Sequence, residues 1–130
     1  MKNTEDRKKV LTMNNLVYAI GRITSSPEIK KTESGKEVCN LTLAVPRSYK
    51  NADGVYETDF IDVVLWNAIA TNTCEYCKKG DLVGIKGRVQ TTNYETEDGT
   101  THKRTEIIAE KVTFLSSNSN KINDELASKE

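Results

Sequence analysis

The chain has 130 residues and a mass of 14.6 kDa, which suits one domain with a hydrophobic core of its own. Hydrophobic residues make up 36% of it and charged residues 29%, and 19 basic residues balance 19 acidic ones. This composition is not that of a disordered chain, and a formal net charge of zero is not that of a strongly basic duplex-DNA binder. No apolar run approaches the roughly 18 residues of a membrane span.

Polarity separates the two ends of the chain from its middle. Residues 1–12 are polar, and we expect a flexible extension there. The region 13–115 carries the regular apolar patterns of a folded domain. Residues 116–130 begin with a Ser/Asn cluster, and we expect a short disordered tail. The acids among the first ten residues argue against a secretory signal, and an odd number of cysteines argues against a disulfide framework, so we expect a cytoplasmic protein.

Alternating apolar and polar residues predict two strands at the start of the domain. The first covers 16–23 and the second covers 39–45. We expect Pro46 to end the second strand, because proline lacks the backbone N–H that a strand needs. Residues 47–57 contain the turn sequence Asn51-Ala52-Asp53-Gly54 and predict a hairpin loop.

The third predicted strand, 58–66, has two different sides, because alternate residues of a strand point in opposite directions. Ile61, Val63 and Leu65 share one side, which we assign to the core. The other side combines two large rings with a carboxylate, which is a poor core composition, so we expect it to face outward. It carries Phe60, Asp62, Val64 and Trp66.

The spacing of apolar residues becomes helical over 67–79, and Gly80 stands where a glycine would end a helix. Strand character returns over 81–94, where Gly84 and Gly87 predict a bulge or a sharp bend.

A turn at Glu97-Asp98-Gly99-Thr100 leads to the last predicted strand, 104–115. The chain is therefore predicted to be all-β with one helix, in the order β-β-β-α-β-β. This order is typical of a five-stranded Greek-key barrel, the OB-fold. A β-sandwich with one helix would give a similar pattern.

Patterns that indicate catalysis or metal binding are sparse. His102 has no carboxylate pair or nucleophile motif around it, and we interpret it as a surface residue. Cys74 and Cys77 form a CxxC pair, but a zinc site commonly uses two such pairs, and only Cys39 and His102 remain as ligands. A redox CxxC would need a βαβ context, which is missing. We therefore expect no enzyme activity, metal or cofactor, and interpret Cys77 as a small core residue.

Several aromatic rings are predicted to lie outside. Phe60 and Trp66 share the outward side of one strand, Tyr94 follows polar and basic residues at even spacing, and Tyr49 lies close to two basic residues. Exposed rings among cations suit a single-stranded nucleic acid, because each stacked base contributes about 1–3 kcal/mol and cations neutralise phosphates. The alternative is that Phe60 and Trp66 fill a second hydrophobic layer or a subunit interface.

Seven short motifs occur in order along 13–115. They are GRI (21–23), PEI (27–29), NLTLAV (40–45, with Arg47 and Tyr49 after it), TDFIDVVLW (58–66), KKGD (78–81), GRVQT (87–91) and TEIIAE (105–110). Together they resemble the bacterial single-stranded DNA-binding protein family. The resemblance implies an OB-fold homotetramer that wraps single-stranded DNA without sequence readout. Such a protein protects unwound strands in replication, recombination and repair. It is cytoplasmic, associates with the nucleoid and does not bind a membrane.

The resemblance also implies roles for individual residues. The base-stacking rings of the family fall on Tyr49, Phe60, Trp66 and Tyr94. The cations that match its DNA-contacting pattern are Lys30, Arg47, Lys78 and Lys79. Three further phosphate contacts are assigned from face and neighbourhood only, and these are Arg22, Lys86 and Arg88.

Three features depart from the family. Asp62 lies among the rings, and Gln90 and Thr92 stand where relatives often carry cations, so we expect a less basic DNA path. The acidic tip that recruits replication and repair proteins is missing, which indicates a truncated chain or a phage- or plasmid-type variant. Residues 1–12 extend beyond the usual start of the family.

Two other classes of protein compete with this interpretation. An OB-fold module related to primosomal replication proteins would bind partner proteins as much as DNA, and would be dimeric. A redox or zinc protein would be built on Cys74 and Cys77.

Overall fold

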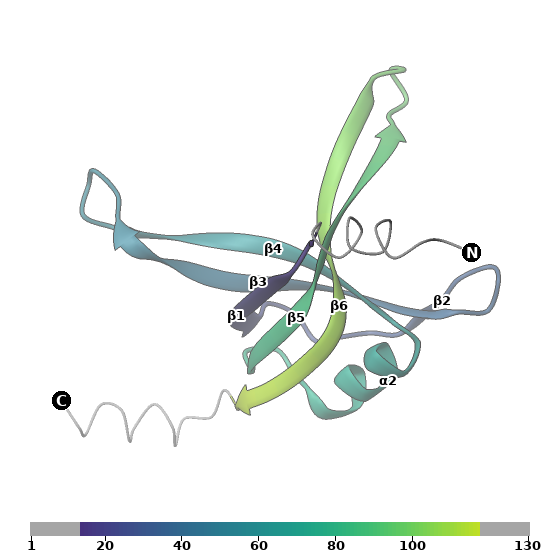
Figure 1. Cartoon of the computed structure of the whole chain (residues 1–130), viewed down its shortest axis with the longest axis horizontal. Coiled ribbons are helices and arrows are strands. Elements are labelled where there is room, and N and C mark those ends of the chain that lie inside the picture. The colour runs from purple at the N-terminus through teal and green to yellow at the C-terminus, as the bar shows by residue number, and fades with distance from the viewer. Residues whose placement is uncertain (1–13, 118–130) are drawn as a thin grey trace, which may run out of the picture.

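The computed structural model describes residues 14–117 of the chain. This part contains six strands and one helix, joined by turns and loops (Figure 1). Their bounds are β1 Val17–Ile23, β2 Lys30–Lys31, β3 Glu37–Lys50, β4 Tyr56–Trp66, α2 Asn67–Tyr76, β5 Leu82–Glu95 and β6 Thr101–Ser116. Each predicted strand and the predicted helix is present, and the two-residue β2 is an addition.

The sheet closes into a barrel because β1 pairs at both ends of the strand order. That order is β1-β5-β6-β4-β3-β2, and β1 also pairs with β3 at Ile23↔Leu43. Five strands therefore form a closed ring, and β2 lies outside it along β3. β4 and β6 run parallel, at Val63↔Ile107, and the other pairs are antiparallel. The predicted fold, a five-stranded barrel of the OB type with one helix, is confirmed.

Two glycines allow the strands of the barrel to approach closely. A Cβ on Gly21 would lie 2.7 Å from the carbonyl oxygen of Ala44, so this residue lets β1 reach β3. A Cβ on Gly87 would collide with the carbonyl group of Ile108. The register of β5 against β6 shifts between Lys86 and Gly87, which confirms the predicted bulge.

The core fills the inside of the barrel with aliphatic side chains from every strand of the ring. Of the side chains predicted to point inward from β4, Val63 and Leu65 are fully buried and Ile61 is half-buried. The buried members of the core are Ile23, Cys39, Leu41, Leu43, Val63, Leu65, Ala70, Cys77, Val83, Ile85, Ile107 and Ala109.

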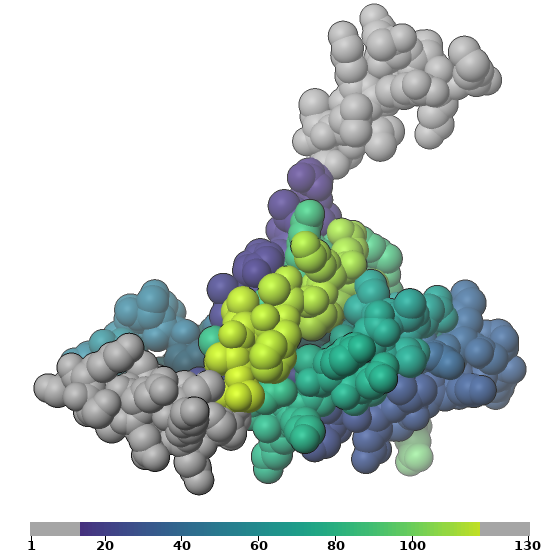
Figure 2. Space-filling view, turned by 90° about the horizontal axis from the view of Figure 1, so that it is seen from below, coloured from purple at the N-terminus to yellow at the C-terminus, as the bar shows by residue number. Residues whose placement is uncertain are grey.

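The helix packs against the barrel through Ala70 and Thr73, its two buried residues. It contacts β3, β4 and β6, and the space-filling view shows it beside β6 (Figure 2). The helix starts directly after Trp66, at Asn67, whose φ of 55° is unusual for a residue with a side chain. No loop separates the end of β4 from the start of α2, so the position of Trp66 is tied to that of the helix.

The helix is shorter than predicted and does not end at Gly80. It ends at Tyr76, and Cys77 already has an extended backbone (φ −112°). Gly80, at φ 90°, belongs instead to a turn in which the Asp81 N–H donates to the Lys78 carbonyl. The reason is tertiary, because Cys77 packs into the core and the Asp81 carboxylate accepts a hydrogen bond from the Lys78 N–H at 2.8 Å.

The prediction that Pro46 ends its strand is wrong. Pro46 pairs with Thr58, and β3 continues to Lys50, which pairs with Tyr56. Residues 47–49 therefore lie opposite Glu57 alone. Proline is tolerated in a strand at such an irregularity, where the regular ladder is already interrupted. The loop shrinks to a tight turn near Asn51, and a long β3–β4 hairpin projects from the barrel (Figure 1).

The outward assignment of Val64 is also wrong, because this side chain is buried. Val64 pairs with Asn40 of β3 on one side and with Ile108 of β6 on the other, so neighbouring strands flank it on both sides. Sequence alternation on β4 does not reveal the parallel neighbour.

The predicted domain limits are only partly within the described residues. The last strand extends to Ser116, one residue past the expected boundary. The expected extension 1–12 lies outside the described residues, and so does the expected tail 116–130 apart from its first two residues. Between 14 and 117, no helix is long and apolar enough to cross a membrane.

Candidate nucleic-acid interface

The four rings predicted to stack on bases are all exposed to solvent. Phe60 and Trp66 were assigned outward by strand alternation, and they do not fill a second hydrophobic layer within residues 14–117. The exposed fractions are 63% for Tyr49, 68% for Phe60, 37% for Trp66 and 50% for Tyr94.

Trp66 and Lys30 lie on the same outer face, in one row across three strands. Val38 of β3 pairs with Trp66 on one side and with Lys30 on the other. Side chains of directly paired residues point to the same face, and neighbouring strands are about 4.8 Å apart, so Lys30 lies about 10 Å from Trp66. This row places a cation within one nucleotide's reach of a ring.

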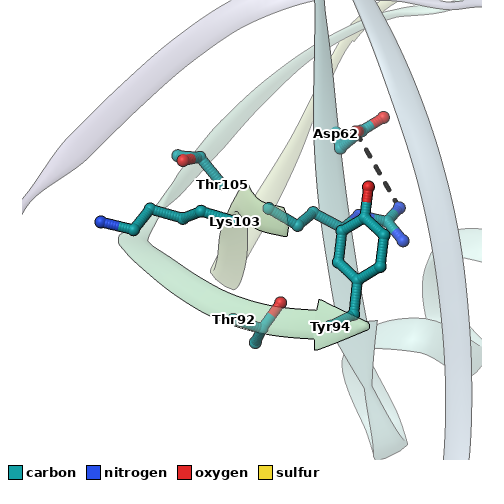
Figure 3. Close-up of a pocket in the computed structure, with 6 residues that line it drawn as sticks. Asp62, Thr92, Tyr94, Lys103 and Thr105 are labelled. Carbon is teal, nitrogen blue, oxygen red and sulfur yellow. Dashed lines mark ion pairs between the residues drawn. The ribbon is translucent and has the colours of Figure 1, made fainter. Parts of the chain in front are cut away.

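Asp62 connects the outer face of β4 with the β5–β6 hairpin. It lies between Phe60 and Trp66 on that face, and it borders a hollow of about 620 Å³ (Figure 3). We call this the wing hollow, and it is lined by Asp62, Thr92, Tyr94, Lys103, Arg104 and Thr105. The hollow brings Tyr94 to the face that carries Phe60 and Trp66, so three of the four predicted rings share one surface.

Arg104 lies in the wing hollow between two carboxylates. Its Nη2 is 3.9 Å from Asp62 Oδ2, and its Nε is 3.7 Å from Glu106 Oε2. Asp62 also accepts a 3.4 Å hydrogen bond from Thr42 Oγ1. The aromatic Tyr94 ring stacks on His102, with centroids 5.5 Å apart and planes at 25°. His102 is thus a surface residue with a specific ring partner.

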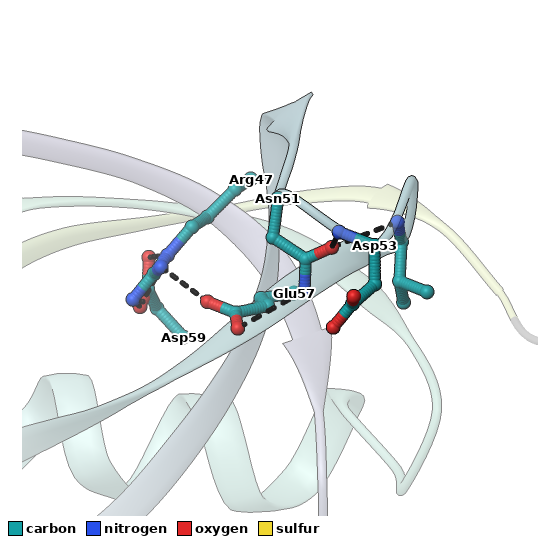
Figure 4. Close-up of polar contacts among 6 residues, drawn as sticks. Arg47, Asn51, Asp53, Glu57 and Asp59 are labelled. Atoms are coloured by element: carbon teal, nitrogen blue, oxygen red, sulfur yellow. Dashed lines mark hydrogen bonds and ion pairs between the residues drawn. The ribbon is translucent and has the colours of Figure 1, made fainter.

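Arg47 is held by acids near the turn of the β3–β4 hairpin (Figure 4). Its Nε and Nη2 donate to Asp59 Oδ1 at 3.1 and 2.9 Å, and its Nη1 is 2.5 Å from Glu57 Oε2. Glu57 also accepts from Asn51 Nδ2 at 3.3 Å, which links the network to the turn. The hydrogen bond to Asp59 raises the pKa of Arg47 and lowers the pKa of Asp59. The predicted phosphate contact is therefore already paired in the free protein.

The other predicted phosphate contacts differ in the contacts that their side chains make within the described residues. Arg22 donates from Nη1 to the Gly80 carbonyl at 2.9 Å, which ties β1 to the turn after α2. The remaining cations are exposed, and these are Lys30, Lys78, Lys79, Lys86 and Arg88.

The three cysteines lie on or near the core as free thiols. Cys39 and Cys77 are buried and Cys74 is half-buried. Burial raises the pKa of Cys74 to about 12, with a hydrogen bond to Cys39 adding to it, and burial also raises the pKa of Cys77. Since the thiolate is the reactive form, Cys74 and Cys77 are poorly suited to redox chemistry at neutral pH.

Comparison with known proteins decides the family. Residues 13–115 match the model of the single-strand binding protein family. The chain belongs to the single-strand binding protein family. It is 46% identical over 103 residues to single-stranded DNA-binding protein B of Bacillus subtilis strain 168, covering 79% of this chain and 91% of that protein.

Other relatives are similar at the same level. Single-stranded DNA-binding protein 3 of Listeria innocua is 48% identical over 108 residues, which cover 83% of this chain and 68% of that protein. The single-stranded DNA-binding protein of Bacillus cereus is 46% identical over 103 residues, covering 79% of this chain and 61% of that protein.

Two cations of this single-strand binding family member were missed by the sequence reasoning. Lys103 and Arg104 lie on β6 in the wing hollow, and neither was assigned a role. A signal was available, because the predicted turn at 97–100 folds Arg104 back opposite Thr92.

Proposed function

We propose that this protein binds single-stranded DNA without reading its sequence and protects unwound strands during replication, recombination and repair. The single observation that carries the proposal is the outer face of β4 with its neighbours, where Phe60, Trp66 and Tyr94 are exposed together. Unpaired bases offer flat faces that such rings stack on, whereas bases in a duplex are already stacked. The names of the relatives support the same ligand.

Two kinds of contact bind the DNA in this proposal. Tyr49, Phe60, Trp66 and Tyr94 stack on bases, and the cations along the loops and strands contact phosphates. The phosphate contacts are Arg22, Lys30, Arg47, Lys78, Lys79, Lys86 and Arg88. Arg47 must exchange a carboxylate for a phosphate to act in this way, since it is paired with Asp59 in the free protein. No reacting group is required, so the protein acts by binding and not as an enzyme.

A competition experiment tests this function. A fluorescently labelled oligo(dT) is bound by the protein, and unlabelled oligo(dT), mixed-sequence single strands and duplex of equal length are added as competitors. The proposal predicts that both single strands compete at similar concentrations and that duplex competes far more weakly. Equal competition by duplex would overturn it.

We also propose a homotetramer, as is typical of the family. The outer face of β1 supports self-association, because Tyr18 and Ile20 alternate along it, Leu16 directly precedes the strand, and all three are exposed. A contiguous apolar strip of this kind is unusual on the surface of a monomer. Sedimentation equilibrium tests the state, and a mass of two chains would favour the related primosomal type of module. Replication and repair proteins as partners, and a cytoplasmic, nucleoid-associated location, belong to the same proposal.

A further inference from the structure

The wing hollow is an open groove of about 620 Å³ whose lining combines one aromatic ring with polar and charged side chains. It lies beside Asp62, so it is continuous with the face that carries Phe60 and Trp66. A single strand that follows this face reaches the hollow.

An aromatic platform is already built on one side of the hollow. Tyr94 and His102 are cross-strand partners on the β5–β6 hairpin, and their rings are stacked. His102 covers one side of the Tyr94 ring. A base placed on the other side would extend a two-ring stack by one layer.

A cation suited to phosphate lies next to this platform. Arg104 is the cross-strand partner of Thr92, two residues from Tyr94. Its planar guanidinium can hold a phosphate with two parallel hydrogen bonds. The carboxylates near it, Asp62 and Glu106, are at 3.9 and 3.7 Å, beyond the range of good hydrogen bonds.

Asp62 is the carboxylate that a phosphate would meet. The side chains of Arg104 and Asp62 are 52% and 46% exposed, while Glu106 is only 12% exposed. Exposed ion pairs are weak, so a phosphate can replace Asp62 beside Arg104. The same carboxylate repels a phosphate in the hollow.

We propose that the wing hollow is a phosphate subsite beside the base that stacks on Tyr94, in which Arg104 holds the phosphate and Asp62 competes against it. This inference rests on the proposed binding of single-stranded DNA. It assigns a DNA contact to β6 and makes Asp62 a residue that weakens binding. The affinity of the subsite for DNA is therefore lower with Asp62 present than Tyr94 and Arg104 alone would produce.

Lys103 provides a matched comparison. It has the same charge as its neighbour Arg104 but pairs with Asn93, so it occupies the alternate position on β6. Its side chain extends away from the Asp62–Arg104 pair (Figure 3). The inference therefore couples Asp62 to Arg104 and not to Lys103.

The test measures the binding of an oligo(dT) of about 15 nucleotides, near the upper site size of one OB-fold. The variants are Asp62→Asn, Arg104→Gln, Lys103→Gln, and Asp62→Asn combined with each of the other two. Asparagine keeps the shape of Asp62 and an oxygen for Thr42 Oγ1. Glu75→Gln removes an equal charge from the exposed surface of α2 and controls for net charge.

At low salt, Asp62→Asn is expected to tighten binding roughly three- to tenfold, and Glu75→Gln much less. Arg104→Gln is expected to weaken binding by a similar factor and to lower the slope of log affinity against log salt by about 0.7. The gain from Asp62→Asn should largely vanish in the Arg104→Gln background and persist in the Lys103→Gln background.

Two results would overturn the inference. One is an unchanged or weaker affinity in Asp62→Asn, with an unchanged melting temperature to show that the variant is folded. The other is a gain from Asp62→Asn that is the same with and without Arg104. If the unmodified protein binds oligo(dT) while either result is found, the subsite fails and the proposed function stands. If the unmodified protein does not bind oligo(dT), both fail.

Discussion

Asp59 accepts hydrogen bonds from two nitrogens of Arg47 across the β3–β4 hairpin, at 3.1 and 2.9 Å. The pair bridges the segment where residues 47–49 lie opposite Glu57 alone. It therefore holds together the irregular part of the hairpin that carries Tyr49.

The Asp59–Arg47 pair predicts a pH dependence of stability. The hydrogen bond from Arg47 lowers the pKa of Asp59 in the folded protein. A carboxyl group with a lowered folded pKa stabilises the fold fully above its unfolded pKa, near 4, and loses this effect as the pH falls through the folded pKa. The melting temperature of Asp59→Asn should thus lie below that of the unmodified protein by a constant amount between pH 6 and 8. The gap should shrink below about pH 4.

Thermal melts followed by circular dichroism check this prediction. Asp53→Asn is the control, because Asp53 lies in the nearby turn and has no ion pair among those found in residues 14–117. A gap for Asp59→Asn that is unchanged at pH 3, or that is absent at pH 7, would contradict it.

Phe60 offers a test of stacking with little effect on the fold. Its ring is the most exposed of the four, so truncation leaves no cavity. Phe60→Ala should weaken binding to oligo(dT) by about 1–3 kcal/mol. Tyr76→Ala is the matched control, because Tyr76 is 71% exposed but lies on α2, away from the outer face of β4. Equal losses in the two variants, measured by fluorescence anisotropy, would refute the assignment.

Gly21 tests the closure of the barrel. A methyl group there would press on the carbonyl oxygen of Ala44, which is backbone and cannot move aside cheaply. Gly21→Ala should lower the free energy of unfolding by about 1–3 kcal/mol or more. Gly35→Asn serves as control, since Gly35 has open space around it and asparagine tolerates its φ of 87°. Equal stability of the two variants in urea denaturation would contradict the role of Gly21 in closing the barrel.

The cysteines predict slow labelling by thiol reagents. Because burial raises the pKa of Cys74 to about 12, the thiolate is scarce at pH 7.5, and Cys39 and Cys77 are buried besides. Labelling with an alkylating reagent should be much slower than in the urea-unfolded chain. Cys74→Ser combined with Cys77→Ser should keep binding to oligo(dT). Rapid labelling of the folded protein, or bound zinc that this double variant loses, would revive the redox or metal interpretation.

Strand alternation predicted most of the fold and the exposed rings, because it is a local property of two-residue spacing. It placed Phe60 and Trp66 outside and Val63 and Leu65 inside, as found. It failed where distant segments decide the outcome. Val64 is buried by its position between β3 and β6, and α2 ends early because Cys77 packs into the core.

The charges of the site could be predicted only in part. Arg47 and Asp59 are twelve residues apart, and their pairing depends on the register of a hairpin whose strand was expected to stop at Pro46. Asp62 and Arg104 meet because β4 and β6 run side by side, which no periodicity in the sequence indicates. The roles of both arginines toward DNA stay predictions.

The most direct test of the central claim uses Trp66, the single tryptophan, as its own reporter. The protein is titrated with oligo(dT) and with duplex of equal length, at low and moderate salt, while tryptophan fluorescence is followed. Stacking of bases on the exposed Trp66 ring predicts strong quenching by the single strand alone. An absence of quenching by oligo(dT) at either salt concentration would contradict the claim that this face of the barrel binds single-stranded DNA.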